Sequence, residues 1–173
     1  MQNASNPTCT EDGYTGDTVC SICGEMLEPG EVIPAHCASK IFQDVDIAKW
    51  YHPYIDYVVD KGLMQGMGNG MFAPDANMTR AQLVTVLYRM AGSPHVESAT
   101  SFQDVPVGTW YTDAVVWAYA NGVTKGVTPD YFQPHAPVTR EQMFTLFARF
   151  AALNGETIET KGCLLYTSPS PRD

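Results

Sequence analysis

Residues 42–51 read FQDVDIAKWY, and residues 102–111 repeat that order as FQDVPVGTWY. When residues 42–91 are aligned on residues 102–151 without a gap, 17 of the 50 positions are identical. Average residue usage would give about three identities by chance. The chain therefore carries a duplicated unit, and this internal repeat decides the expected fold.

Each copy of the unit predicts a helix, a loop and a second helix. Apolar residues recur at spacings of three and four after Trp50 and after Trp110, and Gly62 or Gly122 marks the end of that helix. The loops that follow are rich in glycine and proline. Because one unit of this size buries its apolar faces poorly alone, we expect neighbouring copies to pack together.

The second helix of each unit begins with a Thr-x-x-Gln sequence, TRAQ at residues 79–82 and TREQ at residues 139–142. This pattern predicts a capping box, in which the threonine oxygen accepts from the third backbone amide and the glutamine side chain reaches back. The apolar residues downstream recur at helical period, which indicates core packing rather than a cofactor site.

The charge of the chain is negative and uneven. The net charge of the 173 residues is −9, and residues 1–39 carry six acids and no lysine or arginine. A nucleic-acid partner is therefore not expected, because phosphate binding needs a basic face. No stretch has the apolar length of a membrane span, and the first residues lack the layout of a signal peptide.

In both copies the same motifs follow in one order: Phe-x-Asp-Val, Trp-Tyr, a helix that ends in Gly, Phe-x-Pro, and Thr-Arg-x-Gln. This string resembles the S-layer homology (SLH) domain over residues 41–155. The resemblance implies a bacterial cell-surface anchor, usually of three tandem units arranged as a pseudo-threefold spindle. Such anchors bind secondary cell-wall polysaccharide linked to peptidoglycan, commonly through pyruvylated sugars.

The resemblance sets the expected fold class and domain limits. We expect a mainly α fold in which tandem helix-loop-helix SLH repeats, two of three, pack together behind a small Cys-rich loop or β ribbon. Residues 1–39 form that Cys-rich module, residues 40–97 the first repeat and residues 98–155 the second. We interpret residues 156–173 as the start of a third repeat followed by a foreign tail, which includes Cys163.

By motif position, Arg80 and Arg140 match the arginine of the family's Thr-Arg-Ala-Glu signature, which implies that they bind the glycan. A guanidinium can hold the carboxylate of a pyruvyl ketal through two parallel hydrogen bonds. The alternative is that both arginines only pair with nearby acids. The sequence departs from the signature at Gln82 and Gln142, where the family usually has Glu; glutamine still completes the cap but leaves the arginine less neutralised.

The resemblance also places Trp50 and Trp110 at the family's tryptophan position, where an indole face suits an apolar sugar face. Core packing is the alternative for both. Lys61 and Lys125, near the loops, are weaker candidates for the same site, since charged residues there are most often solvated.

Two further groups of residues are given no chemical role. Asp44 and Asp104 are interpreted as turn or cap residues rather than paired catalytic carboxylates, because each follows Phe-Gln at the entry of an element. The isolated histidines are interpreted as surface or loop residues; they are His52, His95 and His135.

The first 39 residues predict a small metal-stabilised module. Cys20 and Cys23 form a Cys-x-x-Cys-Gly knuckle, in which two thiolates from one tight turn can take adjacent corners of a zinc tetrahedron. Cys9 and either His36 or Cys37 could supply the other two ligands; a resemblance to short Cys-rich modules of Gram-positive surface proteins favours His36. A disulfide framework and free thiols stay open as alternatives, because exported chains meet oxidising surroundings.

Together these features predict a non-catalytic, extracellular module that anchors a protein at the bacterial cell wall. Two alternatives remain: a module for protein interaction or self-association, and the tether of an enzyme whose catalytic domain lies elsewhere.

Overall fold

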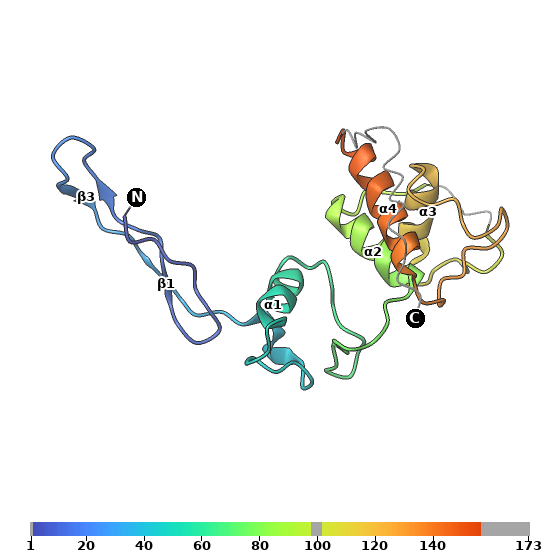
Figure 1. The fold of residues 1–173 in the computed structure, drawn as a ribbon, viewed down its shortest axis with the longest axis horizontal. Coiled ribbons are helices and arrows are strands. Elements are labelled where there is room, and N and C mark those ends of the chain that lie inside the picture. Colours follow the sequence, from blue (N-terminus) through green and yellow to red (C-terminus); the bar gives the residue numbers. More distant parts are fainter. Residues whose placement is uncertain (1, 98–101, 157–173) are drawn as a thin grey trace, which may run out of the picture. The chain divides into compact units, whose positions relative to one another are not determined.

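A computed structural model describes residues 2–97 and 102–156, and the chain divides into two compact units, Met1–Ala76 and Asn77–Asp173 (Figure 1). The boundary falls inside the first sequence repeat, before its Thr-x-x-Gln motif. The second helix of that repeat therefore folds together with the second repeat. The predicted start of a third repeat and the foreign tail lie outside the described residues from residue 157 onward.

The first unit begins with a narrow ribbon of short strands (Figure 1). Strand β1 (Gly13–Tyr14) pairs antiparallel with β4 (Val32–Ile33), and β2 (Thr18–Val19) pairs antiparallel with β3 (Met26–Glu28). Within residues 2–37 no apolar side chain is buried. This part of the ribbon therefore has no hydrophobic core of its own.

A polar network takes the place of a core in the ribbon. The Tyr14 hydroxyl donates to Asp17 Oδ1, and the Gly30 N–H donates to the Tyr14 oxygen at 2.9 Å and to Asp17 Oδ1 at 3.0 Å. The Tyr14 hydroxyl lowers the pKa of the Asp17 carboxyl below its usual value. A disulfide between Cys9 and Cys37 closes the base of the ribbon.

The rest of the first unit consists of the 3₁₀ helix η1 (Ala38–Ile41), the helix α1 (His52–Asp60) and a long loop. Helix α1 packs on η1 and buries His52 and Ile55. Part of the apolar face predicted for this helix is exposed, including Tyr54 and Tyr57. Gly62, at φ +66°, follows the helix as the predicted left-handed stop.

The second unit holds the main hydrophobic core. It contains α2 (Arg80–Met90), α3 (Thr112–Ala120) and α4 (Arg140–Leu153), and α2 packs against both of the others. Val84 and Leu87 of α2 are 0% exposed, and the ring of Tyr88 lies 5.7 Å from that of Trp117 in α3. The second helix of one repeat is thus covered by the first helix of the next.

Helix α4 is the counterpart of α2 in the second repeat but lacks that cover within the described residues. Phe144 occupies the position equivalent to Val84 and is 60% exposed, and Phe147, equivalent to Leu87, is also exposed. The predicted core stripe is therefore only partly correct for α4, where Leu146 and Phe150 are buried. The face that α2 uses to bind the next helix is left open on α4.

The aspartate of each Phe-Gln-Asp-Val motif clasps a distant loop. Asp104 accepts the N–H groups of Phe132 at 2.9 Å and Gln133 at 2.7 Å, with one carboxylate oxygen each. Asp44 does the same in the first unit for Phe72 and Ala73. The interpretation as local turn or cap residues missed these partners. The clasp holds Ala73 and Gln133 in the left-handed region, at φ 58° and 59°.

One glycine per copy lets the loop approach the clasping motif. A Cβ on Gly126 would lie 2.6 Å from the Phe102 ring and 2.6 Å from the Thr128 carbonyl oxygen, and φ at Gly126 is +78°. Gly66 meets Phe42 in the same way. At both positions a side chain would collide with a phenylalanine ring and a carbonyl oxygen, and the backbone has a positive φ. Only glycine meets both conditions without strain.

Candidate functional site

The two Thr-x-x-Gln motifs form complete capping boxes at the starts of α2 and α4, as predicted. The Gln82 N–H donates to Thr79 Oγ1 at 3.3 Å, and the Thr79 N–H donates to Gln82 Oε1 at 2.8 Å. Gln142 and Thr139 make the same pair at 3.2 Å and 3.3 Å. Both helix starts are therefore fixed in the same geometry, and the arginine follows the cap in each.

Arg80 is buried, with only 5% of its surface exposed. Its Nε donates to the carbonyl oxygen of Phe132 at 2.8 Å, and its guanidinium carbon lies 4.9 Å from the centre of the Phe132 ring. Burial lowers the pKa of Arg80, and the charge of Asp104 opposes that shift. Arg80 thus binds the clasped loop of the second repeat rather than a surface acid.

The same loop also seals the start of α2. The Arg80 N–H donates to Ala136 O at 3.0 Å, and the Ala81 N–H donates to Pro134 O at 2.9 Å. The first backbone donors of a helix otherwise need a side chain, water or ligand. At α2 the neighbouring repeat supplies the acceptors.

The start of α4 is open by comparison. Arg140 is exposed, and within residues 2–97 and 102–156 no protein acceptor is paired with the N–H groups of Arg140 and Glu141. An exposed guanidinium and free N–H groups at the positive end of a helix suit a bound carboxylate. The side chain of Glu141 is also exposed here and adds a negative charge that opposes an anion.

Both predicted stacking tryptophans lie at the surface. Trp50 is 80% exposed and Trp110 is 60% exposed. Each indole makes a T-shaped contact with the tyrosine that follows it, Tyr51 at 5.7 Å and Tyr111 at 5.1 Å between ring centres. Core packing is therefore not their role in the described structure, and both side chains are accessible to a ligand.

The two lysines are exposed as well. Lys61 lies next to α1, with Nζ 3.5 Å from Asp60 Oδ2 and 5.9 Å from the centre of the Tyr57 ring. Lys125 lies in the loop after α3. Neither lysine is buried against a neighbour that would fix its position.

A family model for the S-layer homology domain matches the chain twice, at residues 41–84 and 101–144. The chain belongs to the S-layer homology family. The two matches begin at the Phe-Gln-Asp-Val motifs and extend into α2 and α4, so they confirm the two tandem SLH repeats read from the sequence.

The SLH repeats are similar to parts of larger proteins. The "S-layer protein sap" of Bacillus anthracis is 36% identical over 129 residues, which is 72% of this chain and 16% of the relative. The "Cellulosome-anchoring protein" of Acetivibrio thermocellus is 27% identical over 157 residues, 86% of this chain and 35% of the relative. The "Amylopullulanase" of Thermoanaerobacterium thermosulfurigenes is 25% identical over 147 residues, 83% of this chain and 8% of the relative. The chain thus spans about a third or less of these relatives.

None of the described helices is long and apolar enough to span a membrane. The cysteines of the N-terminal ribbon precede the first SLH match.

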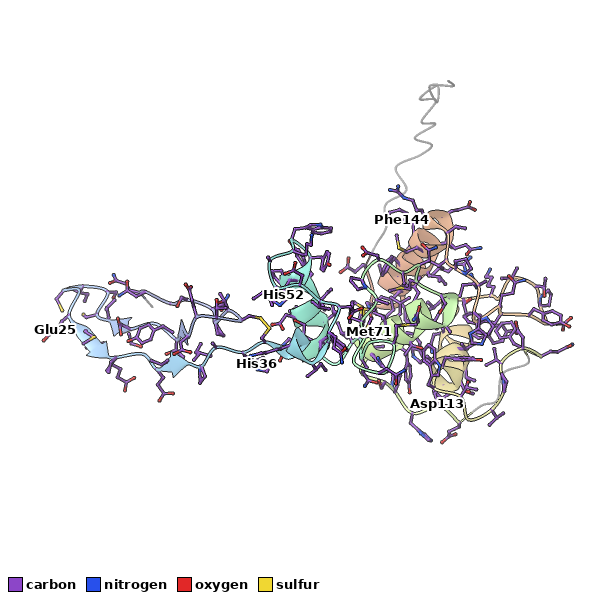
Figure 2. All side chains as sticks on the ribbon, turned by 90° about the horizontal axis from the view of Figure 1, so that it is seen from below. Glu25, His36, His52, Met71, Asp113 and Phe144 are labelled. Carbon is purple, nitrogen blue, oxygen red and sulfur yellow. A yellow bond between two sulfur atoms is a disulfide. The ribbon has the colours of Figure 1, made fainter. Side chains whose placement is uncertain are left out.

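The structure does not assemble the predicted zinc ligands around the Cys-x-x-Cys knuckle. Cys9 is disulfide-bonded to Cys37, while Cys20 and Cys23 are free thiols. Figure 2 shows Glu25, close to the knuckle, at the tip of the ribbon and His36 at its base. The N–H groups of Cys23 and Ile22 donate to the Cys20 sulfur and lower the pKa of that thiol.

His36 lies apart from the knuckle and interacts with α1 instead. Its Nε2 lies 3.3 Å from Asp60 Oδ1, and the side chain is exposed. Of the alternatives to a zinc site, the structure contains one disulfide, between Cys9 and Cys37.

The interpretation of His52 as a surface or loop residue is wrong. His52 is the first residue of α1, is 6% exposed, and places Nε2 3.4 Å from Cys9 Sγ and 3.5 Å from Cys37 Sγ. These partners of His52 could not be recognised from the sequence, because Cys9 and Cys37 lie 43 and 15 residues away from it.

Proposed function

We propose that the chain is a non-catalytic module that anchors a surface protein to the bacterial cell wall by binding a secondary cell-wall polysaccharide. Membership of the SLH family and relatives named as S-layer and cellulosome-anchoring proteins support this proposal. The observation that carries it is the open start of α4, where Arg140 is exposed and the N–H groups of Arg140 and Glu141 have no protein acceptor among the described residues.

The chemistry favours an acidic substituent on the polymer, such as a pyruvyl ketal. Its carboxylate would bind the Arg140 guanidinium through two charge-assisted hydrogen bonds. The exposed ring of Trp110 supplies an apolar surface for a neighbouring sugar. Trp50, Gln82, Gln142, Lys61 and Lys125 belong to the proposed glycan-binding set, with the glutamines fixing the helix starts.

Arg80 has a different role in the proposal from that of its counterpart. Its guanidinium already holds the Phe132 carbonyl and is almost fully buried. We propose that Arg80 shapes the binding surface by fixing the second repeat's loop, and that contact between Arg80 and the glycan requires that loop to move.

A further repeat would complete the module. The exposed face of α4 with Phe144 and Phe147 corresponds to the face of α2 that the next repeat covers. We propose that the first helix of a further SLH repeat packs on it. Several linked repeats would retain the protein more strongly than one, because binding of a second site is intramolecular.

The contacts of Asp44 and Asp104 do not suggest catalysis. Both oxygens of Asp104 accept backbone N–H groups, and so do both oxygens of Asp44. This arrangement holds a loop and leaves neither group placed as a general acid or base, which supports a binding function.

Cosedimentation with purified cell-wall sacculi tests the proposal. We expect the chain to bind intact sacculi and to lose binding when the secondary polymer is removed by acid extraction. Arg140→Ala should weaken binding about 10-fold or more, as expected for loss of a charge-assisted pair. Arg149→Ala, which removes the same charge further along α4, is the matched control.

Retention on stripped sacculi, or equal binding of both arginine variants, contradicts glycan anchoring. The exposed Phe144 and Phe147 favour one second candidate, a module for self-association or for docking another surface protein. That function predicts concentration-dependent oligomers, lost in Phe144→Ser, with no change on removal of the wall polymer.

A further inference from the structure

Four side chains capable of binding a metal converge where the ribbon meets α1. They are Cys9, Cys37, His52 and Asp56, and their ligand atoms all lie within 4.8 Å of one another. His52 and Asp56 are four residues apart in α1, so they project from the same side of the helix. The two cysteines come from the start and the end of the ribbon.

The buried imidazole of His52 faces the two sulfur atoms directly. Its Nε2 lies 3.4 Å and 3.5 Å from them, and the Ser39 hydroxyl oxygen lies 3.1 Å away on a third side. Ser39 also donates its N–H at 2.9 Å and its hydroxyl at 3.1 Å to Asp56 Oδ1. The carboxylate is therefore oriented by a second residue before any ligand arrives.

A comparison of the two repeats supports a special role for these residues. His52 corresponds to Thr112 and Asp56 corresponds to Val116, both buried in α3. The histidine and the carboxylate thus occur in the repeat that follows the cysteines and are replaced in the repeat that does not. Ordinary packing of an SLH helix does not require them.

We propose that Cys9, Cys37, His52 and Asp56 form a zinc site when the Cys9–Cys37 disulfide is reduced. A dithiol reductant supplies two electrons and two protons, which break the S–S bond and give two thiols while the reductant becomes a disulfide. Zn²⁺ then replaces the two thiol protons and binds two thiolates, His52 Nε2 and one Asp56 oxygen. Two sulfurs, one imidazole nitrogen and one carboxylate oxygen are ligands that four-coordinate zinc accepts.

The site would keep the ribbon joined to α1 in both redox states. In the oxidised state the disulfide closes the base of the ribbon, and η1 carries Cys37 onto α1. In the reduced state zinc would hold the same two sulfurs and add direct bonds to the helix. The Cys-x-x-Cys knuckle, at the other end of the ribbon, is not part of this site.

Cobalt and zinc titration of the reduced, otherwise intact chain tests the proposal. Co²⁺ should produce the thiolate charge-transfer band and strong visible bands of tetrahedral coordination, and Zn²⁺ should displace it. A Cys20→Ser/Cys23→Ser variant should retain these bands, whereas Cys9→Ser/Cys37→Ser should lose them. The oxidised chain with both tip cysteines replaced should give no bands.

The helix ligands are tested separately, because their variants keep both cysteines. His52→Ala should lower the zinc affinity more than about 100-fold, and Ser39→Ala, which loses only an orienting contact, about 10- to 100-fold. His36→Ala should leave the affinity unchanged. Circular dichroism of each oxidised variant checks that it folds.

Three results overturn the proposal. They are the absence of zinc binding to the reduced native chain, loss of the cobalt bands in Cys20→Ser/Cys23→Ser, and unchanged affinity in both folded variants, His52→Ala and Ser39→Ala. Each of them leaves the proposed glycan anchoring untouched, since none of the four zinc ligands belongs to the proposed glycan-binding set.

Discussion

Arg80 Nε donates a hydrogen bond to the carbonyl oxygen of Phe132, a residue that lies 52 positions further along the chain. The bond joins the start of the second helix in one SLH repeat to the clasped loop of the next. Arg140, in the same position of the second repeat, is exposed. Identical motif residues therefore differ in environment according to whether a following repeat covers them.

This difference predicts unequal effects of the same substitution on stability. Arg80→Ala removes a hydrogen bond from a charged donor to a buried carbonyl and should lower the free energy of unfolding of the second unit by about 1.5–3 kcal/mol. Arg140→Ala should change it by less than about 0.5 kcal/mol, as for an ordinary surface residue. Urea unfolding of both variants measures the two values; equal losses would contradict the structural role of Arg80.

A second prediction concerns Gly122 and Gly126, two glycines in the loop after α3. Gly122→Ala and Gly126→Ala both place a side chain at positive φ, which costs about 1–2 kcal/mol. At Gly126 the added methyl also meets the Phe102 ring and a carbonyl oxygen, whereas at Gly122 nothing lies within 4 Å. Thermal unfolding should therefore show a loss for Gly126→Ala that exceeds the Gly122→Ala loss by about 1–3 kcal/mol. Comparable melting temperatures would argue against the close approach.

The Asp44 clasp predicts a dependence of stability on pH in the first unit. The N–H groups of Phe72 and Ala73 lower the pKa of Asp44, so its folded pKa lies below the unfolded value of about 3.9. The ionised carboxylate stabilises the fold above the unfolded pKa, and this contribution is lost as the pH falls through the folded pKa. The amide signals of Phe72 and Ala73 in ¹H–¹⁵N spectra should report the loss during acid titration.

Asp44→Asn is the control for this titration. In this variant the stability of the first unit should depend less steeply on pH. A residual slope of the same sign should remain, because the Tyr14 hydroxyl lowers the pKa of Asp17 as well. An unchanged slope would show that the clasp does not depend on the charge of Asp44.

The open start of α4 predicts a substitution that improves binding. Glu141 places a carboxylate beside Arg140, where the first repeat has Ala81. Glu141→Ala should therefore strengthen binding to cell-wall sacculi, by about 3-fold or more at low salt, and the gain should shrink as salt rises. Thr145→Ala, one turn further along the exposed surface of α4, provides a comparison without a charge change. Weaker binding of Glu141→Ala would mean that the carboxylate contacts the polymer favourably.

Local features of the fold could be predicted from the sequence. The Thr-x-x-Gln motifs form capping boxes and Gly62 ends α1 in the left-handed conformation, because these depend on residues within one turn of each other. The packing between the repeats could not be predicted in this way. Nothing within one repeat shows that Arg80 is buried by a loop from the next, so the exposed and buried copies of the motif look identical in sequence.

The cysteine module shows a similar limit. The zinc site was predicted around Cys20 and Cys23 because they form a Cys-x-x-Cys motif. In the structure, however, Cys9 is bonded to Cys37, and both lie beside His52. One signal was available in the sequence: the first repeat carries His52 and Asp56 where the second carries Thr112 and Val116. His52 and Asp56 lie one helical turn apart, and the second repeat keeps neither of them. A polar pair that occurs in one copy of a repeat indicates a partner that the other copy lacks.

The disulfide between Cys9 and Cys37 spans 28 positions and closes a covalent loop around the ribbon. Force applied at residues 9 and 37 of the oxidised chain would pass through this bond, so the strands β1 to β4, which lie inside the loop, would carry none of it. The bridges that Gln2 and Ser5 make with Asp17 and Tyr14 begin outside the loop and would open first under tension.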